Sequence, residues 1–139
     1  MRRTAVAVAL MLAVTPVVVK PVAADPPFTT AAEVRPILSM TRDRWVAVRE
    51  YGGQDLVYLT QLVAWRCGLA ELWVGINDEA EAPFPLEPCY RDTPQPNAVR
   101  GEPWLARPLD SVQSVRVHLL YADGETDSHE VTRAEVLMH

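Results

Sequence analysis

Two histidines near the end of the sequence have a spacing that could support metal chemistry. His118 and His129 lie in two alternating segments joined by Asp123-Gly124. If Asp123-Gly124 is a two-residue turn, the register places both imidazoles on one face, about 5 Å apart at Cβ, with Asp127 diagonal to them. Such a set of side chains could bind a transition metal.

A second form of the same turn separates the histidines. In a three-residue loop, Ala122-Asp123-Gly124, a bulge shifts the register so that Val117 faces His129. His118 then points to the opposite face of the sheet. The sequence leaves both registers open. We assign no metal site and no cofactor, and keep His118, His129 and Asp127 as candidate ligands only.

A pair of carboxylates flanks the turn Gly52-Gly53. Glu50 and Asp55 would face each other across this hairpin. Two facing carboxylates could share a proton or bind calcium. Because turn tips rarely exclude water, we expect a solvated tip instead.

Nucleophilic catalysis finds no support in the sequence. Ser111, Ser114 and Ser128 are available, but none lies in a Gly-x-Ser-x-Gly elbow. Ser128 and His129 are neighbours in an expected strand and therefore point to opposite faces. There is also no glycine-rich phosphate loop, no His-Glu-x-x-His and no Cys-x-x-Cys. We name no catalytic residue.

The elements that position these residues follow from local patterns. Thr30 and Glu33 have the spacing of a capping box, which predicts a helix over 31–41 that Pro36 kinks or weakens. Residues 61–66 fit a strand or a helical turn equally well. Alternation predicts strands over 45–51, 54–59, 69–77, 112–121 and 126–133. We therefore expect an α+β domain with one N-terminal helix packed on an antiparallel sheet of about five strands.

Residues 78–109 have no periodicity and hold seven of the twelve prolines. We expect one long, ordered, proline-rich loop, because connections of this length are usually either functional or disordered. Phe84, Tyr90 and Trp104 are its aromatic residues. They are either anchors that recognise a partner or a lid over the sheet.

The first 24 residues have the pattern of a secretory signal peptide. A basic start precedes an apolar run over 4–19, and small side chains precede the expected cleavage between Ala24 and Asp25. An uncleaved membrane anchor is disfavoured, because the run is shorter than the roughly 20 residues that a spanning helix needs. We expect 25–139 to be a single globular domain in the periplasm or outside the cell, without stable membrane insertion.

The charge of the chain argues against nucleic acid as a partner. The 139 residues include 13 basic and 18 acidic side chains. Residues 25–139 keep all the acids and ten arginines but no lysine, so their net charge is −8. Such a chain lacks the basic patch that phosphate backbones or anionic membranes require.

Export gives the two cysteines a role. Cys67 and Cys89 are the only pair, and an oxidising compartment favours one structural disulfide between them. It would close a loop of about 22 residues and stabilise the fold by roughly 3 kcal/mol. A redox-active dithiol is the alternative, but thioredoxin-type sites have cysteines two residues apart.

Several segments together resemble a family of small exported bacterial proteins that has no assigned activity. The two with cysteines are Trp65-Arg66-Cys67-Gly68-Leu69 and Glu87-Pro88-Cys89. The others are 31–38, 45–51, 95–98 and 111–115, so the resemblance covers about 31–136. It implies an exported domain and assigns no catalytic or binding residue.

Two functions remain as hypotheses. The preferred one is a non-enzymatic binding or accessory module that engages a protein or small ligand through the 78–109 loop and the neighbouring sheet face. The alternative is a small hydrolase or metal-binding protein centred on His118 and His129. The sequence does not indicate an oligomeric state.

Overall fold

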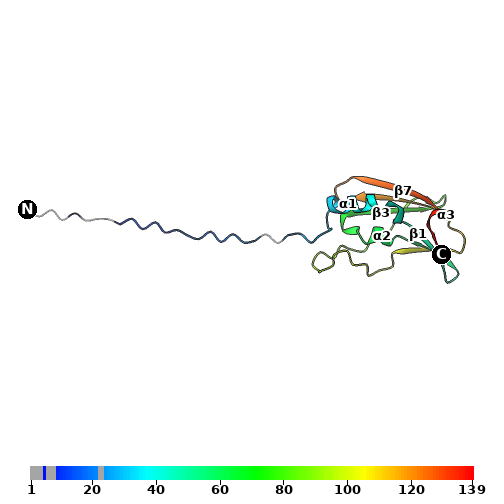
Figure 1. The fold of residues 1–139 in the computed structure, drawn as a ribbon, viewed down its shortest axis with the longest axis horizontal. Helices are drawn as coiled ribbons and strands as arrows, with labels where there is room; N and C mark the ends of the chain where they lie inside the picture. The colour runs from blue at the N-terminus through cyan, green and yellow to red at the C-terminus, as the bar shows by residue number, and fades with distance from the viewer. Residues whose placement is uncertain (1–4, 6–8, 22–23) are drawn as a thin grey trace, which may run out of the picture.

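The structure is a computed structural model that describes residues 5, 9–21 and 24–139. Residues 9–21 form no helix or strand, are exposed, and extend away from the folded part of the chain (Figure 1). The basic start Met1-Arg2-Arg3 and residues 22–23, just before the expected cleavage point, lie outside the described residues. Within the described part, no helix has the length and apolarity needed to cross a membrane.

The folded part combines short helices with eight strands and is therefore α+β. The helical segments are α1 (Ala31–Met40), η1 (Arg42–Arg44), α2 (Thr60–Val63), η2 (Arg66–Gly68) and α3 (Arg133–Val136). The strands are β1 (Ala47–Tyr51), β2 (Gln54–Tyr58), β3 (Leu69–Ile76), β4 (Ala82–Pro83), β5 (Trp104–Pro108), β6 (Ser114–Tyr121), β7 (Thr126–Thr132) and β8 (Leu137–Met138).

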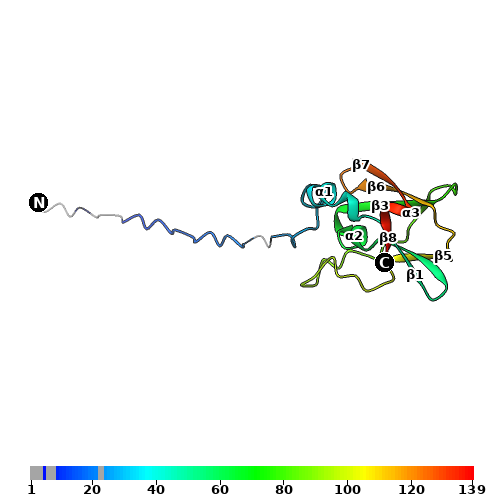
Figure 2. The ribbon, with the colours of Figure 1, turned by 45° about the vertical axis from the view of Figure 1, so that its right-hand side comes forward.

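The expectation of one sheet of about five strands is wrong. The strands form two four-stranded sheets, which we call sheet A (β5-β2-β1-β8) and sheet B (β4-β3-β6-β7). In Figure 2 sheet B lies above sheet A. All strand pairs are antiparallel except β1 and β8. The chain leaves sheet A after β2 through α2 and η2, which also settles 61–66 as helical rather than extended.

Two of the strands lie inside the expected proline-rich loop. β4 pairs with β3, and β5 pairs along its whole length with β2. Alternation did not reveal β5 because it is an edge strand that ends in Pro108 and follows Pro103. Proline has no amide hydrogen to donate to a neighbouring strand, so within sheets it occurs at edge strands and strand ends.

Helix α1 begins at the predicted capping box. The Glu33 amide donates to Thr30 Oγ1 at 3.3 Å, and the Thr30 amide donates back to the Glu33 carboxylate at 3.2 Å. The helix continues through Pro36 to Met40. Its expected position on the face of a single sheet is wrong, since α1 lies beside η2. A side chain at Gly68 would lie 2.7 Å from Cβ of Val34, so this approach requires glycine.

One hydrophobic core fills the space between the sheets. The register in which Glu50 faces Asp55 also places Val48 opposite Val57, and both of these valines are fully buried. Sheet B contributes the alternate residues of β6. Trp45 is also fully buried, and its indole N–H donates to the Leu38 carbonyl at 2.9 Å. The core therefore joins both sheets and α1 into one packed unit.

The expectation of a solvated tip between Glu50 and Asp55 is wrong for Asp55. The two residues do face each other, but the Asp55 side chain has no exposed surface. Its carboxylate accepts from Arg133 Nη1 at 2.6 Å and from the amides of Asp110 and Val112 at 3.2 and 3.1 Å. Glu50 stays half exposed and accepts from the same guanidinium at 2.7 Å. Asp55 and Glu50 therefore share the Arg133 guanidinium rather than a proton or a calcium ion.

These bonds set the protonation of the pair. The hydrogen bond from Arg133, with help from the two amides, holds the pKa of Asp55 below its ordinary value despite burial. The same bond raises the pKa of Arg133. Because the folded pKa of Asp55 is lowered, its stabilisation is complete above the unfolded-state value of 3.8 and is lost as pH falls through the folded value.

Replacing Asp55 should therefore destabilise the fold far more than replacing its neighbour. We expect Asp55→Asn to cost about 3 kcal/mol of unfolding free energy at neutral pH, because it leaves Arg133 without its buried partner. Glu50→Gln removes a half-exposed contact to the same guanidinium and should cost less than about 1 kcal/mol. Urea unfolding of both variants measures the difference.

The pH dependence provides an independent check. The unfolding free energy of the wild type should fall below about pH 4 more steeply than that of Asp55→Asn, which has lost this titration. Equal losses for the two neutralised carboxylates, or parallel pH profiles for wild type and Asp55→Asn, would contradict a dominant role for the buried pair.

Candidate functional site

The structure resolves the register of the β6–β7 hairpin in favour of the three-residue loop. Val117 faces His129, and His118 faces Ser128. The Tyr121 amide donates to the Glu125 carbonyl at 2.8 Å, and Gly124 adopts a φ of +90°, which favours glycine. The two histidines therefore point to opposite faces of sheet B. The register that would have joined them is wrong.

Each candidate metal ligand has different surroundings. The His129 ring packs edge-on against Trp45, with ring centroids 5.9 Å apart. Asp127 forms an ion pair with Arg42 at 2.7 Å. Among the described residues, no three His, Cys, Asp or Glu side chains gather as a metal site would require. His118 instead lines a shallow pocket of about 370 Å³ on the outer face of sheet B, together with Glu71, Trp73, Glu81, Leu120 and Thr126.

The predicted disulfide between Cys67 and Cys89 is present, with Cα atoms 5.0 Å apart. Cys67 follows a buried arginine, and its amide donates to Asn97 Oδ1 at 3.0 Å. Asn97 in turn donates through Nδ2 to the Phe28 carbonyl at 2.8 Å. The disulfide is therefore one of several bonds that fasten the proline-rich segment to η2 and to the start of α1.

Arg66 is the centre of that attachment, although its side chain is only 2% exposed. Its guanidinium donates to the carbonyls of Pro88 at 2.8 Å, Asn97 at 3.0 Å and Ala98 at 3.1 Å. Further bonds reach Glu87 and Val63. Every N–H direction of the guanidinium fork therefore meets a carbonyl oxygen, so the buried charge is well solvated by the backbone.

Tyr90 and Glu87 of the segment pack around the same guanidinium. Arg66 lies over the Tyr90 ring, 5.2 Å from its centroid, and Arg100 lies over the same ring at 4.0 Å. Glu87 accepts from the Tyr90 hydroxyl at 2.8 Å and from the amides of Arg100 and Gly101. Burial alone would raise the pKa of Glu87, but these bonds hold it below its ordinary value.

The three expected recognition residues have different locations. Phe84 is buried in the core. Tyr90 is half buried. Its hydroxyl donates to Glu87, and Arg66 and Arg100 lie over its ring. Trp104 begins β5, is half buried, and lies against Tyr58 with ring centroids 5.6 Å apart. Of the three, only Trp104 contributes to an open sheet face.

The outer face of sheet A, to which Trp104 belongs, also holds a groove with residues suited to binding. The sequence analysis did not predict this groove. On the side of sheet A away from the core, β1 presents Arg49 and Tyr51, and Tyr58 lies across from Ala47. Met138 reaches the same place because β8 pairs with β1 next to Arg49. We call the hollow of about 340 Å³ formed here the arginine groove, and it is lined by Arg44, Ala47, Arg49, Tyr58, Thr60, Gln61 and Met138.

The groove has an apolar floor and charged flanks. Within the described residues, the guanidinium groups of Arg44 and Arg49 donate no hydrogen bond and lie within ion-pair distance of no carboxylate. Arg49 does lie over the Tyr51 ring, 5.1 Å from its centroid. Tyr51 and Met138 are 63% and 55% exposed. The alternation of Arg49 and Tyr51 with Val48 was visible in the sequence, but the arrival of β8 was not.

Comparison with known proteins adds no assignment to this geometry. No protein-family model, no curated protein and no solved structure matches the chain.

The attachment of the proline-rich segment predicts that Arg66 cannot be replaced by lysine. Arg66→Lys keeps the charge but lacks the planar fork, so several buried carbonyls lose their donor. We expect a loss of about 2 kcal/mol in unfolding free energy and faster hydrogen exchange of the Tyr90 amide, which donates to Pro96. Arg100→Lys, over the same ring but exposed, is the matched control and should change stability by less than about 0.5 kcal/mol.

Hydrogen exchange followed by mass spectrometry and urea unfolding measure these effects. An Arg66→Lys variant whose proline-rich segment exchanges as slowly as in the wild type would show that the disulfide and the Asn97 bonds hold the segment without the guanidinium fork.

Proposed function

We propose that this protein is an exported, non-enzymatic binding module that contacts its partner through the arginine groove and the aromatic side chains beside it. The observation that carries the proposal is the composition of this face. Arginine, tyrosine, tryptophan and methionine are the residues enriched at protein interfaces, and all four types occur here on the outer face of sheet A. Of the three aromatic residues expected to recognise a partner, this proposal keeps Trp104 and no longer includes Phe84 and Tyr90.

The rigidity of the groove supports a binding role. Tyr58, the aromatic residue that lines the groove, lies on the paired strand β2 and packs against Trp104 of β5. Side chains that are already ordered lose little entropy when a partner binds. β5 is in turn the end of the segment that Arg66 and the disulfide fasten to η2.

Export is supported by two independent features. The Cys67–Cys89 disulfide is compatible with an oxidising compartment, and the apolar run over 4–19 precedes small residues before Asp25. The alternative of a hydrolase or metal-binding protein centred on His118 and His129 has no supporting contact, because those side chains lie on opposite faces of sheet B.

The proposed export predicts the N-terminus of the mature protein. The mature protein should begin at Asp25, because cleavage follows Ala24. Intact mass and N-terminal sequencing of the exported protein will measure this. Ala24→Arg should block cleavage and leave the precursor uncut, whereas Asp25→Asn, one residue beyond, should be cut normally. A mature protein that retains the 4–19 segment would contradict the signal-peptide assignment.

The binding face can be tested by crosslinking in the exporting cell. A photoreactive phenylalanine analogue at Tyr51 should give a discrete crosslinked product, because this position is exposed beside the groove. The same analogue at Thr126, exposed on the outer face of sheet B, is the matched control and should give none. Mass spectrometry identifies the product. Equal crosslinking from both positions, or none from Tyr51, would contradict the proposed face.

A further inference from the structure

We propose that the arginine groove binds an acidic peptide segment, with aspartate or glutamate side chains of the segment pairing with Arg44 and Arg49. This inference rests on the proposed binding function of the same face and specifies the chemistry of the partner.

The distribution of charge in the domain is the first argument. Residues 25–139 carry 18 acidic side chains against ten arginines, so carboxylates are abundant. Six of the arginines lie within ion-pair distance of a carboxylate: Arg35, Arg42, Arg66, Arg107, Arg116 and Arg133. Of these six, Arg66 is also buried among backbone carbonyl groups. The remaining four arginines have no carboxylate within ion-pair distance among the described residues, although the domain is rich in acid.

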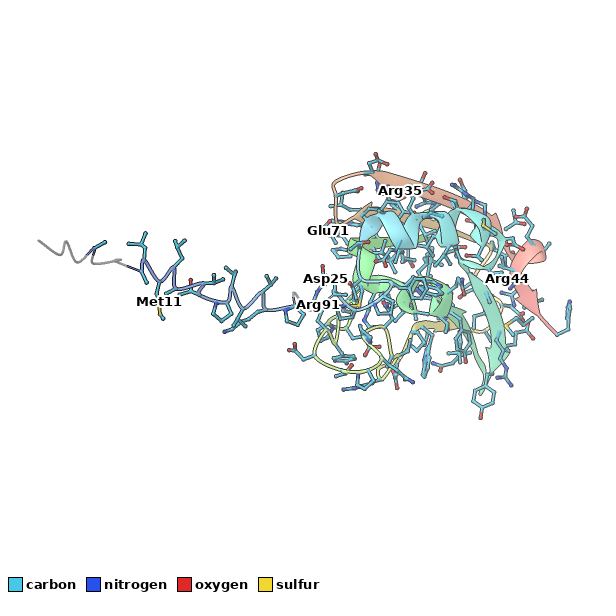
Figure 3. All side chains as sticks on the ribbon, turned by 60° about the vertical axis from the view of Figure 1, so that its left-hand side comes forward. Met11, Asp25, Arg35, Arg44, Glu71 and Arg91 are labelled. Atoms are coloured by element: carbon cyan, nitrogen blue, oxygen red, sulfur yellow. A yellow bond between two sulfur atoms is a disulfide. The ribbon has the colours of Figure 1, made fainter. Side chains whose placement is uncertain are left out.

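Arg44 and Arg49 are two of these four, and they lie in one groove although they come from different elements. Arg44 ends η1, while Arg49 lies on the outer face of β1. The other two lie outside the groove: Arg91 donates to the Thr29 carbonyl, and Arg100 lies over Tyr90. Figure 3 shows Arg44 at the end of the domain remote from Arg91 and Asp25. The groove therefore brings together two guanidinium groups that have no carboxylate or hydrogen-bond acceptor of their own in the described part of the chain, and a ligand there could bind both.

The shape and lining of the groove favour a short segment of chain. A volume of about 340 Å³ is at the lower end of the range for ligand sites, enough for a few side chains. Tyr58 and Met138 provide apolar contact, and the exposed Thr60 provides a hydroxyl. Guanidinium groups bind carboxylates through paired, charge-assisted hydrogen bonds. A peptide that alternates acidic with apolar residues matches both the charges and the apolar floor.

The net charge of the domain disfavours dense polyanions as the occupant. A membrane rich in anionic lipid or a nucleic acid would be repelled by the 18 carboxylates of the domain at short range, and two arginines cannot offset that repulsion. An acidic peptide brings only a few charges, all of which can lie in the groove. The electrostatic attraction should fall as salt is added.

The test measures binding of a defined probe to the purified mature protein. The probe is a fluorescein-labelled peptide that alternates glutamate and leucine, and its neutral counterpart carries glutamine in place of glutamate. Fluorescence anisotropy should show binding of the acidic peptide alone, weakened by salt. The double variant Arg44→Glu and Arg49→Glu should bind about tenfold more weakly or worse.

A matched control separates the groove from the overall charge. Arg91→Glu with Arg100→Glu changes the net charge by the same amount at sites outside the groove, and should change peptide affinity by less than about threefold. A second variant, Arg44→Lys with Arg49→Lys, keeps the charge but not the fork, and should weaken binding by an intermediate factor. Thermal melts confirm that each variant is folded.

Three results would overturn the inference. These are equal affinity for the acidic and neutral peptides, equal losses in the two charge-reversed variants, or binding of anionic vesicles or inorganic pyrophosphate in preference to the peptide. Crosslinking from Tyr51 without any affinity for the acidic peptide would reject the acidic partner and leave the binding face intact. Absence of both would reject the inference together with the proposed function.

Discussion

The chain crosses between the two sheets four times, and two buried charged residues fix the connections that make these crossings. Asp55 and Arg66 are the buried charged residues of the described part of the chain. Asp55 binds the β5–β6 connection through the amides of Asp110 and Val112, and the β7–β8 connection through Arg133. Arg66 lies in the β2–β3 connection and binds carbonyls of the β4–β5 connection. Because a buried charge is costly without partners, each residue demands a fixed arrangement of the segments around it.

The candidate binding face depends on both arrangements. Arg133 begins α3, which brings β8 and therefore Met138 beside Arg49. The segment fastened by Arg66 leads into β5, which sets Trp104 against Tyr58. Neither strand would be expected to stay in place on its own, since β8 has two residues and β5 is an edge strand. The groove is thus assembled by interactions in the connections rather than by the strands that line it.

Much of the local structure could be predicted from the sequence, and the failures have a common cause. The capping box of α1, the hairpin register that pairs Glu50 with Asp55 and the Cys67–Cys89 disulfide each follow from nearby residues or from a unique pair. The number of sheets, β5 and the burial of Asp55 did not follow. Each depends on contacts between distant residues, such as Asp55 with Arg133, and hairpin geometry alone suggested a solvated tip.

The sequence by itself therefore determined the class of fold, the paired cysteines and the faces of single strands, because side-chain periodicity and residue type act over a few positions. It left the histidine register open between two turns, and only the structure separated His118 from His129. The division into two sheets and the meeting of Arg44, Arg49 and Met138 in one groove were likewise decided by the tertiary structure. The physical reason is that buried charges and cross-sheet packing join segments that no local pattern relates.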